Sequence, residues 1–170
     1  KAIKAINKDI GKKKNKIQVE KLDDAYNAGT ANSRNCTLII TEGDSAKTLA
    51  IAGLKIVGRD NYGVWPLRGK PLNIRNVSAN KQAANKEFVN FQKIMGLQSG
   101  KKQGIEELRY GHILIMTDQD NDGFHIKGLV INALHILCPD LLKIGGFVKT
   151  MITPVIKATK GKRKKEFYNM

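Results

Sequence analysis

Three aspartates at alternate positions carry the clearest chemical signal in this sequence. Asp118, Asp120 and Asp122 come just after the apolar run Ile113–Met116 and precede Gly123. Carboxylates this close together repel one another strongly unless a cation lies between them. Because a short apolar run of this kind is typical of a buried strand, we interpret the segment as a divalent metal site at the end of a strand.

Two other interpretations of this acidic segment have to be weighed. A calcium loop of the EF-hand type needs a carboxylate at its twelfth position, which is Leu129 when counted from Asp118. It also needs a preceding helix, where Ile113–Met116 indicates a strand. Calcium is therefore disfavoured, whereas an acidic turn that binds nothing stays open from this segment alone.

A second acidic motif favours the metal interpretation. The apolar run Thr37–Ile40 leads into Glu42, and an amphipathic stretch follows whose apolar members are Leu49, Ala52, Leu54, Ile56 and Val57. In an open parallel sheet, turns of this kind meet at the carboxyl edge of neighbouring strands, where ligands bind. We therefore expect Glu42 to lie near Asp118. Mg²⁺ suits such a site, because it binds a few carboxylates and completes its shell with water and phosphate oxygens.

Basic residues stand between the two acidic motifs. Arg68 and Lys70 flank Gly69 at the end of a predicted strand, and Asn73 follows. Glycine lets the backbone approach a phosphate closely, and the cations can neutralise it. The alternative is an ordinary Arg-Gly-Lys turn without a ligand.

The alternation of predicted elements indicates an α/β fold with a parallel sheet flanked by helices. We expect strands at 37–41, 63–67 and 113–117, and helices at about 45–57, 80–95 and 125–137. We expect residues 1–35 to form a basic helix end and a linker, with a surface loop at 21–35. Residues 36–150 then form the metal-binding domain. Residues 151–170 form a strand and hairpin extension: strands are expected at 147–153, 155–158 and 166–168, with Gly161 at a hairpin tip.

The charge and the cysteine content of the chain limit the kinds of binding partner and cellular environment to be expected. The net charge is +15, and the excess is concentrated in two runs, 1–21 and 157–165. Such runs can be merely solvated surface, but beside an acidic metal site they favour a polyanion that carries phosphates. We interpret Cys36 and Cys138 as reduced packing residues of an intracellular protein. No signal peptide or apolar run long enough to span a membrane is present, and the lack of an initial Met indicates a segment of a longer protein.

Taken together, three motifs resemble the signature stretches of the Toprim (Rossmann-like) domain of type IIA DNA topoisomerases, in the same order. They are Glu42-Gly43-Asp44-Ser45-Ala46, Pro66-Leu67-Arg68-Gly69-Lys70 and Asp118-Gln119-Asp120-Asn121-Asp122-Gly123. The resemblance covers most of 21–170. Its spacers are more similar to the eukaryotic topoisomerase II type, or to a relative from a large DNA virus, than to bacterial gyrase.

The resemblance implies roles for particular residues. Glu42 and Asp118 would hold the catalytic Mg²⁺, and Asp118 with Asp120 would hold a second ion, tuned by Asp122. Mn²⁺ or Ca²⁺ would substitute in binding. Lys70 and Asn73 match positions that contact double-stranded DNA beside the cut, and Arg68 lies where it could reach the backbone.

The resemblance also implies a reaction and an assembly. The reaction is reversible transesterification by a tyrosine of a following winged-helix region, in an ATP-dependent homodimeric nuclear enzyme. The tyrosine and the ATPase domain lie outside this chain, so the chain alone is expected to bind metal and DNA without cutting. Two alternatives stay open: another Toprim enzyme, a primase or nuclease, and a non-catalytic basic DNA-binding module.

Overall fold

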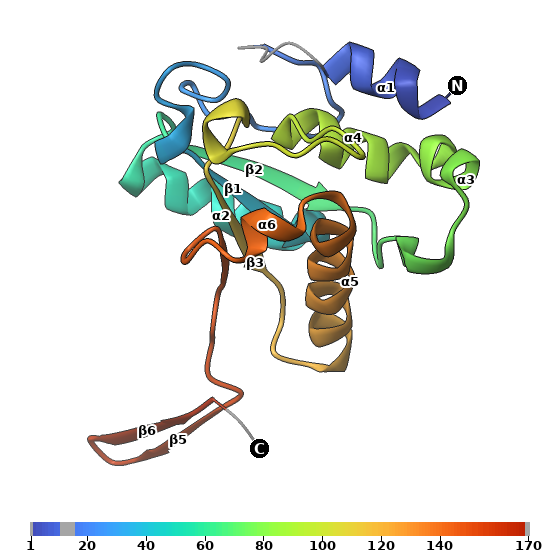
Figure 1. Cartoon of the computed structure of the whole chain (residues 1–170). Coiled ribbons are helices and arrows are strands. Elements are labelled where there is room, and N and C mark those ends of the chain that lie inside the picture. Colours follow the sequence, from blue (N-terminus) through green and yellow to red (C-terminus); the bar gives the residue numbers. More distant parts are fainter. Residues whose placement is uncertain (1, 11–15, 169–170) are drawn as a thin grey trace.

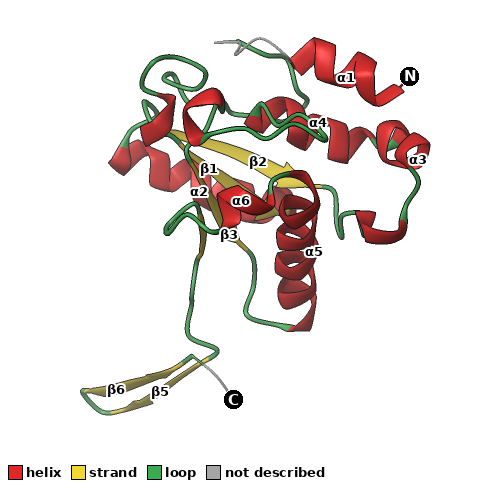
Figure 2. Cartoon of the chain, viewed as in Figure 1, coloured by secondary structure: helices red, strands yellow, loops and turns green. Residues whose placement is uncertain are grey.

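Helices and strands alternate along most of the chain (Figures 1 and 2). The computed structural model describes residues 2–10 and 16–168. Its elements, in chain order, are α1 (Ala2–Ile10), β1 (Thr37–Glu42), α2 (Gly43–Val57), β2 (Tyr62–Leu67), α3 (Ala79–Ala84), α4 (Lys86–Met95), β3 (His112–Met116), α5 (Asn121–Leu137), α6 (Pro139–Leu142), β4 (Val148–Thr150), β5 (Ile156–Lys160) and β6 (Arg163–Phe167).

The first four strands form one sheet in the order β2-β1-β3-β4. All neighbours are parallel, and Thr41 of β1 lies opposite Pro66 of β2 on one side and Met116 of β3 on the other. The chain therefore runs outward from β1 to β2 and then crosses back to β3 on the far side of β1. Such a reversal of strand order opens a crevice at the carboxyl edge between β1 and β3, which is where ligands bind in open α/β sheets.

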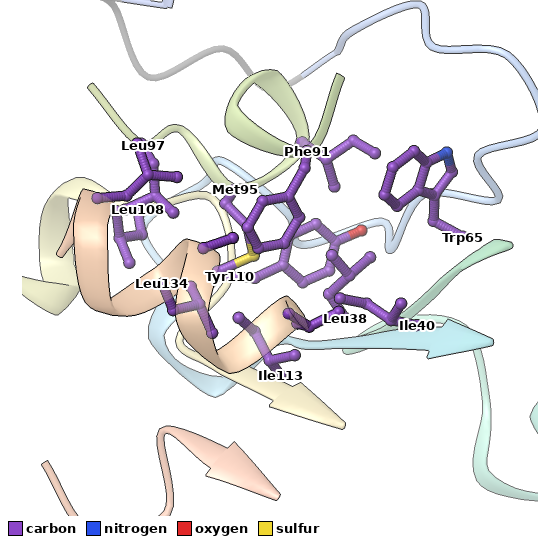
Figure 3. Close-up of a cluster of buried hydrophobic side chains, with 14 of the residues drawn as sticks. Leu38, Ile40, Trp65, Phe91, Met95, Leu97, Leu108, Tyr110, Ile113 and Leu134 are labelled. Atoms are coloured by element: carbon purple, nitrogen blue, oxygen red, sulfur yellow. The ribbon is translucent and has the colours of Figure 1, made fainter. Parts of the chain in front are cut away.

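Alternate residues of β1 supply the two faces of the sheet. Leu38 and Ile40 pack into the larger core with Phe91 of α4 and Val130 of α5 (Figure 3), whereas Ile39 packs with Ala50 and Leu54 of α2 on the other face. The amphipathic stretch predicted after Glu42 is helical as expected. Of its five predicted apolar members, however, only Leu54 is buried, and four remain exposed: Leu49, Ala52, Ile56 and Val57.

The segment at 21–35 corrects one prediction, because it is anchored to the core instead of forming a simple surface loop, and four of its residues are buried. Ala28 and Ser33 are fully buried. The backbone N–H and C=O of Asp23 both hydrogen-bond to Val64, at 2.9 and 2.8 Å, beside β2. The Asp24 carboxylate accepts from Arg109 Nη2 at 2.5 Å and from the Tyr110 hydroxyl. These side chains fasten the segment to the core.

Three element boundaries also differ from the predicted ones. The helix expected at 80–95 is split at Asn85, whose side chain accepts from Phe88 N at 2.8 Å and so caps α4. Helix α5 begins at Asn121, four residues earlier than expected, and β4 is shorter than the strand expected at 147–153. The helix expected near the start is present as α1, whereas 11–15 lie outside the described residues.

The two cysteines are free and buried, as predicted. Burial raises the pKa of the Cys138 thiol to about 12, so it stays protonated and packs as a small apolar group. Among the described residues, no helix is long and apolar enough to span a membrane.

The C-terminal hairpin extension is confirmed, although its strands at 156–160 and 163–167 are longer than those expected at 155–158 and 166–168. β5 and β6 pair antiparallel as a sheet of their own, with Gly161 in the left-handed region at the tip, φ 59°. Figure 1 shows this two-stranded ribbon standing away from the body at the end of a long connection from β4.

Candidate metal and DNA site

The two acidic motifs meet at the crevice between β1 and β3. Glu42 is the last residue of β1 and stands directly before α2, and Asp118 follows β3 by two residues. Gly43 turns the chain from strand to helix with φ 76°, a conformation that side chains with a Cβ rarely adopt. The convergence predicted from the sequence is therefore present in the fold.

Glu42 is the most unusual carboxylate in this crevice. Its Oε2 is buried without a hydrogen-bond partner among the described residues. The pKa of Glu42 is raised, and burial is the largest cause. The negative charges of Asp120, Asp118 and Asp122 raise this pKa further, whereas a hydrogen bond from the Asp118 backbone lowers it. A desolvated carboxylate facing other carboxylates is poorly stabilised as an anion, and a bound cation would supply the missing partner.

The start of α5 fixes the other carboxylates. Asp120 is the N-cap, and its Oδ1 accepts from Gly123 N at 2.8 Å; Asp122 lies in the first turn. A Cβ at Gly123 would lie 2.0 Å from the carbonyl oxygen of Asp118, so only glycine lets the loop pass this close to the helix. The positive end of the helix dipole partly offsets the carboxylate charges here.

Lys70 joins the acidic cluster directly. Its Nζ lies 2.8 Å from Asp122 Oδ1, and this hydrogen bond is the main reason that the pKa of Asp122 is lowered. The loop after β2 thus brings its predicted DNA-binding lysine into contact with one of the predicted metal ligands. Both side chains are largely exposed, so the pair is open to exchange with solvent ions.

The two remaining predicted DNA contacts lie farther from the carboxylates. Asn73 Oδ1 accepts from Asn132 Nδ2 at 2.9 Å. Since Asn132 lies ten residues after Asp122 on α5, Asn73 is about 15 Å along the helix from the acidic cluster. The Arg68 guanidinium pairs with Glu20, while its backbone N–H donates to Glu87 Oε1 at 2.7 Å. In this structure Arg68 therefore belongs to the outer rim of the site.

Sequence reasoning missed a pair of polar residues that hold the acidic loop. Lys127 is 9% exposed, and its Nζ donates to Gln119 Oε1 at 3.1 Å while lying 4.8 Å from the ring centroid of Phe124. Gln119 Nε2 in turn donates to Met151 O at 3.2 Å, just beyond β4. The loop between Asp118 and Asp120 is thereby tied to the next strand. The only sequence signal for this pair is Lys127, a lysine within the apolar face of a predicted helix.

The donor set fits a divalent cation in chemistry, although two of its carboxylates have protein partners. Within 2–10 and 16–168, no three His, Cys, Asp or Glu side chains are gathered as ligands of one ion. Two of the carboxylates are already engaged, Asp120 in capping α5 and Asp122 with Lys70. The orphaned Oε2 of Glu42 is the observation that fits a metal, since carboxylate oxygens are ligands that Mg²⁺ prefers.

Comparison with known proteins identifies relatives along almost the whole chain. The Toprim domain family model matches residues 37–151. DNA topoisomerase 2 of Bombyx mori is 52% identical over 168 residues, covering 96% of this chain and 11% of the relative. The enzyme of the same name from Saccharomyces cerevisiae is 53% identical over 171 residues, 98% of this chain and 12% of the relative. DNA topoisomerase 2 of Acanthamoeba polyphaga mimivirus is 51% identical over 160 residues, covering 94% of this chain and 13% of the relative.

A solved structure agrees with these sequence relatives. The crystal structure of the Plasmodium falciparum topoisomerase II DNA-binding, cleavage and re-ligation domain superimposes with a TM-score of 0.86 at 51% identity, covering 92% of this chain and 22% of that one. The chain spans only about a tenth of the length of the sequence relatives that it matches.

Proposed function

Because the chain belongs to the Toprim domain family, we propose that it is the Mg²⁺-binding half of the DNA cleavage–religation centre of an ATP-dependent type II DNA topoisomerase. The observation that carries the proposal is the buried, unpartnered Oε2 of Glu42 at the strand-order reversal, beside Asp118. The sequence relatives are DNA topoisomerase 2 enzymes, and the similar solved structure is a DNA-binding, cleavage and re-ligation domain. The reaction proposed for the longer protein is double-strand passage by reversible transesterification. The longer protein is, in this proposal, a nuclear homodimer that acts on double-stranded DNA.

Each carboxylate has a part in the proposed centre. Glu42 and Asp118 would hold the Mg²⁺ nearest the reacting phosphate, and Asp118 with Asp120 would hold a second ion, tuned by Asp122. When bound, Mg²⁺ stabilises the negative charge that develops on the leaving 3′-oxygen. Gln119 and Lys127 hold the loop through their contacts to Met151 and Phe124, so the backbone that carries Asp118 and Asp120 stays in place as charge develops.

The attacking tyrosine would come from outside this chain. Tyr110 is fully buried, and burial together with the Asp24 carboxylate raises its pKa far above the usual range, so it is a structural residue. Tyr168 lies on the ribbon side of the chain, 50% exposed, and its hydroxyl donates to Glu166 rather than facing the carboxylates. The chain alone therefore supplies the metal and DNA contacts of the centre without its nucleophile.

Lys70 provides a first test of the DNA contact. In the proposal its ammonium exchanges Asp122 for a DNA phosphate. Lys70→Ala is expected to weaken duplex binding and to reduce the slope of log K against log[salt] by about 0.9, one phosphate contact. The measurement is a fluorescence anisotropy titration of duplex DNA at several salt concentrations. Lys81→Ala, on exposed α3, is the matched control; an unaltered slope in Lys70→Ala would remove Lys70 from the DNA contacts.

Trapping of covalent protein–DNA complexes tests the proposed function as a whole. The chain would replace the corresponding segment of the Saccharomyces cerevisiae relative, and plasmid cleavage with Mg²⁺ would be stopped with detergent. Breaks with protein attached to the DNA are expected. Breaks without attached protein would favour a Toprim nuclease, and DNA binding without any breaks would favour the non-catalytic module.

A further inference from the structure

The ribbon formed by β5 and β6 differs in charge from the rest of the molecule. Between 156 and 167 it carries six basic residues and a single acid, Glu166. The paired positions are Ile156 with Phe167, Lys157 with Glu166, Ala158 with Lys165, Thr159 with Lys164, and Lys160 with Arg163. Because cross-strand partners point to the same face, basic side chains occupy both faces, and the outer half of the ribbon has no acid.

The cations at the outer half of the ribbon lack carboxylate partners. Lys157 at the base pairs with Glu166 at 3.4 Å, and Lys165 lies 5.1 Å from the ring centroid of Phe167. Among the described residues, no carboxylate is paired with the four cations nearest the tip: Lys160, Lys162, Arg163 and Lys164. By contrast, three cations near the acidic site each have a carboxylate in contact: Lys70, Arg68 and Lys21.

This ribbon is poorly stabilised by its own contacts. Every residue of both strands is exposed. An isolated two-stranded hairpin is marginally stable in water, and like charges directly opposite each other, as at Lys160 and Arg163, weaken it further. A polyanion along the ribbon would relieve that repulsion.

The ribbon also leaves the body beside the acidic site. β4 runs parallel to β3, so the two strands end at the same edge of the sheet. Just beyond β4, Met151 N donates to Ile115 O at 2.9 Å, and Met151 O accepts from Gln119, which lies between Asp118 and Asp120. Figure 1 shows the connection to β5 descending on the same side as the loop that leads into α5.

We propose that the ribbon at 156–167 is a second contact surface for double-stranded DNA, which grips phosphates of the duplex away from the carboxylate site. The choice of duplex DNA as the polyanion rests on the proposed function. A two-stranded ribbon has the width that a major groove admits, and cations on both faces meet phosphates of both strands. The contact is independent of base sequence, because lysine and arginine at exposed positions bind the phosphate backbone as charges.

The test compares two variants of the chain that remove the same charge. One carries Lys160→Gln, Lys162→Gln and Lys164→Gln on the ribbon. The other carries Lys55→Gln, Lys81→Gln and Lys102→Gln at exposed positions of the body, outside both basic runs. Binding of a fluorescent duplex is measured with chelator across a salt series. The ribbon variant is expected to bind at least about tenfold more weakly near 0.1 M salt, with a slope shallower by up to about 2.7. The control variant is expected to keep nearly the wild-type slope.

A second readout is hydrogen exchange of the ribbon amides in the wild-type chain. Exchange at 156–167 is expected to be fast in the free protein and slowed when duplex is added. Equal losses in both variants, or exchange that DNA leaves unchanged, would overturn the ribbon contact. Failure of the ribbon inference can be distinguished from failure of the proposed function. If only the ribbon inference is wrong, Lys70→Ala still weakens DNA binding. If only the proposed function is wrong, the ribbon variant still binds DNA more weakly, although the trapping assay gives no cleavage.

Discussion

Replacement of Asp118 by Asn is expected to lower the yield of covalent DNA complexes by about two to three orders of magnitude in the trapping assay. Asp118 is the one carboxylate assigned to both metal positions, so its neutralisation weakens both. The same assay with Glu42→Gln is expected to give a loss of similar order. Both substitutions preserve the size of the side chain while removing the charge that a metal requires.

The control for this loss is Asp140→Asn. Asp140 is an exposed carboxylate on α6 that pairs with Lys143 and Lys102, away from the crevice between β1 and β3. Cleavage within a factor of a few of wild type is expected for it. If Asp118→Asn cleaves as well as Asp140→Asn does, the metal assignment is wrong.

A large effect on stability is expected from Asp24→Ala. The Arg109 side chain is 2% exposed, and the Asp24 carboxylate is its ion-pair partner at 2.5 Å. Removal of one partner leaves a buried cation poorly compensated, which costs about 3–5 kcal/mol when a pair is fully buried. Because Asp24 is itself 24% exposed, we expect a loss of about 2–4 kcal/mol in the free energy of unfolding. Urea denaturation followed by circular dichroism measures it.

The matched control is Asp60→Ala, an exposed carboxylate in the loop before β2. It is expected to change stability by less than about 0.5 kcal/mol. A loss that is no larger for Asp24→Ala than for Asp60→Ala would mean that the Arg109 contacts, which include Ile94 O at 2.9 Å, suffice without Asp24.

The convergence of the two acidic motifs was predictable because it follows from the order of apolar strands and the carboxylates after them. Thr37–Ile40 and Ile113–Met116 are short apolar runs followed by carboxylates, and a parallel sheet places the ends of such strands together. The register that sets Thr41 opposite Met116 confirms that reasoning. The contact between Lys70 and Asp122 was not predicted, because it depends on the path of an irregular loop rather than on a repeating pattern.

The error at 21–35 has a different physical cause, which is contact between residues distant in sequence. The stretch at 21–35 is rich in Gly, Asn and Ser and looks like a solvated loop, but Asp24 meets Arg109 and Tyr110 some 85 residues later. The other two errors are local. Asn85 ends one helix and caps the next, which composition alone does not distinguish from a helix interior position. The early start of α5 reflects the capping role of Asp120, whose position in the sequence indicates only a metal ligand.

Titration of the chain with Mn²⁺, followed by the electron paramagnetic resonance signal of the free ion, tests most directly whether Glu42 and Asp118 hold a divalent metal. Wild type and Asp140→Asn are expected to bind alike, and Glu42→Gln and Asp118→Asn to bind at least about tenfold more weakly. Thermal unfolding of the same samples distinguishes the loss of a metal ligand from misfolding of the variant. Since burial raises the pKa of Glu42, neutral Gln at this position is not expected to lower the unfolding temperature of the metal-free protein. Equal Mn²⁺ binding by all four folded proteins would contradict the metal site.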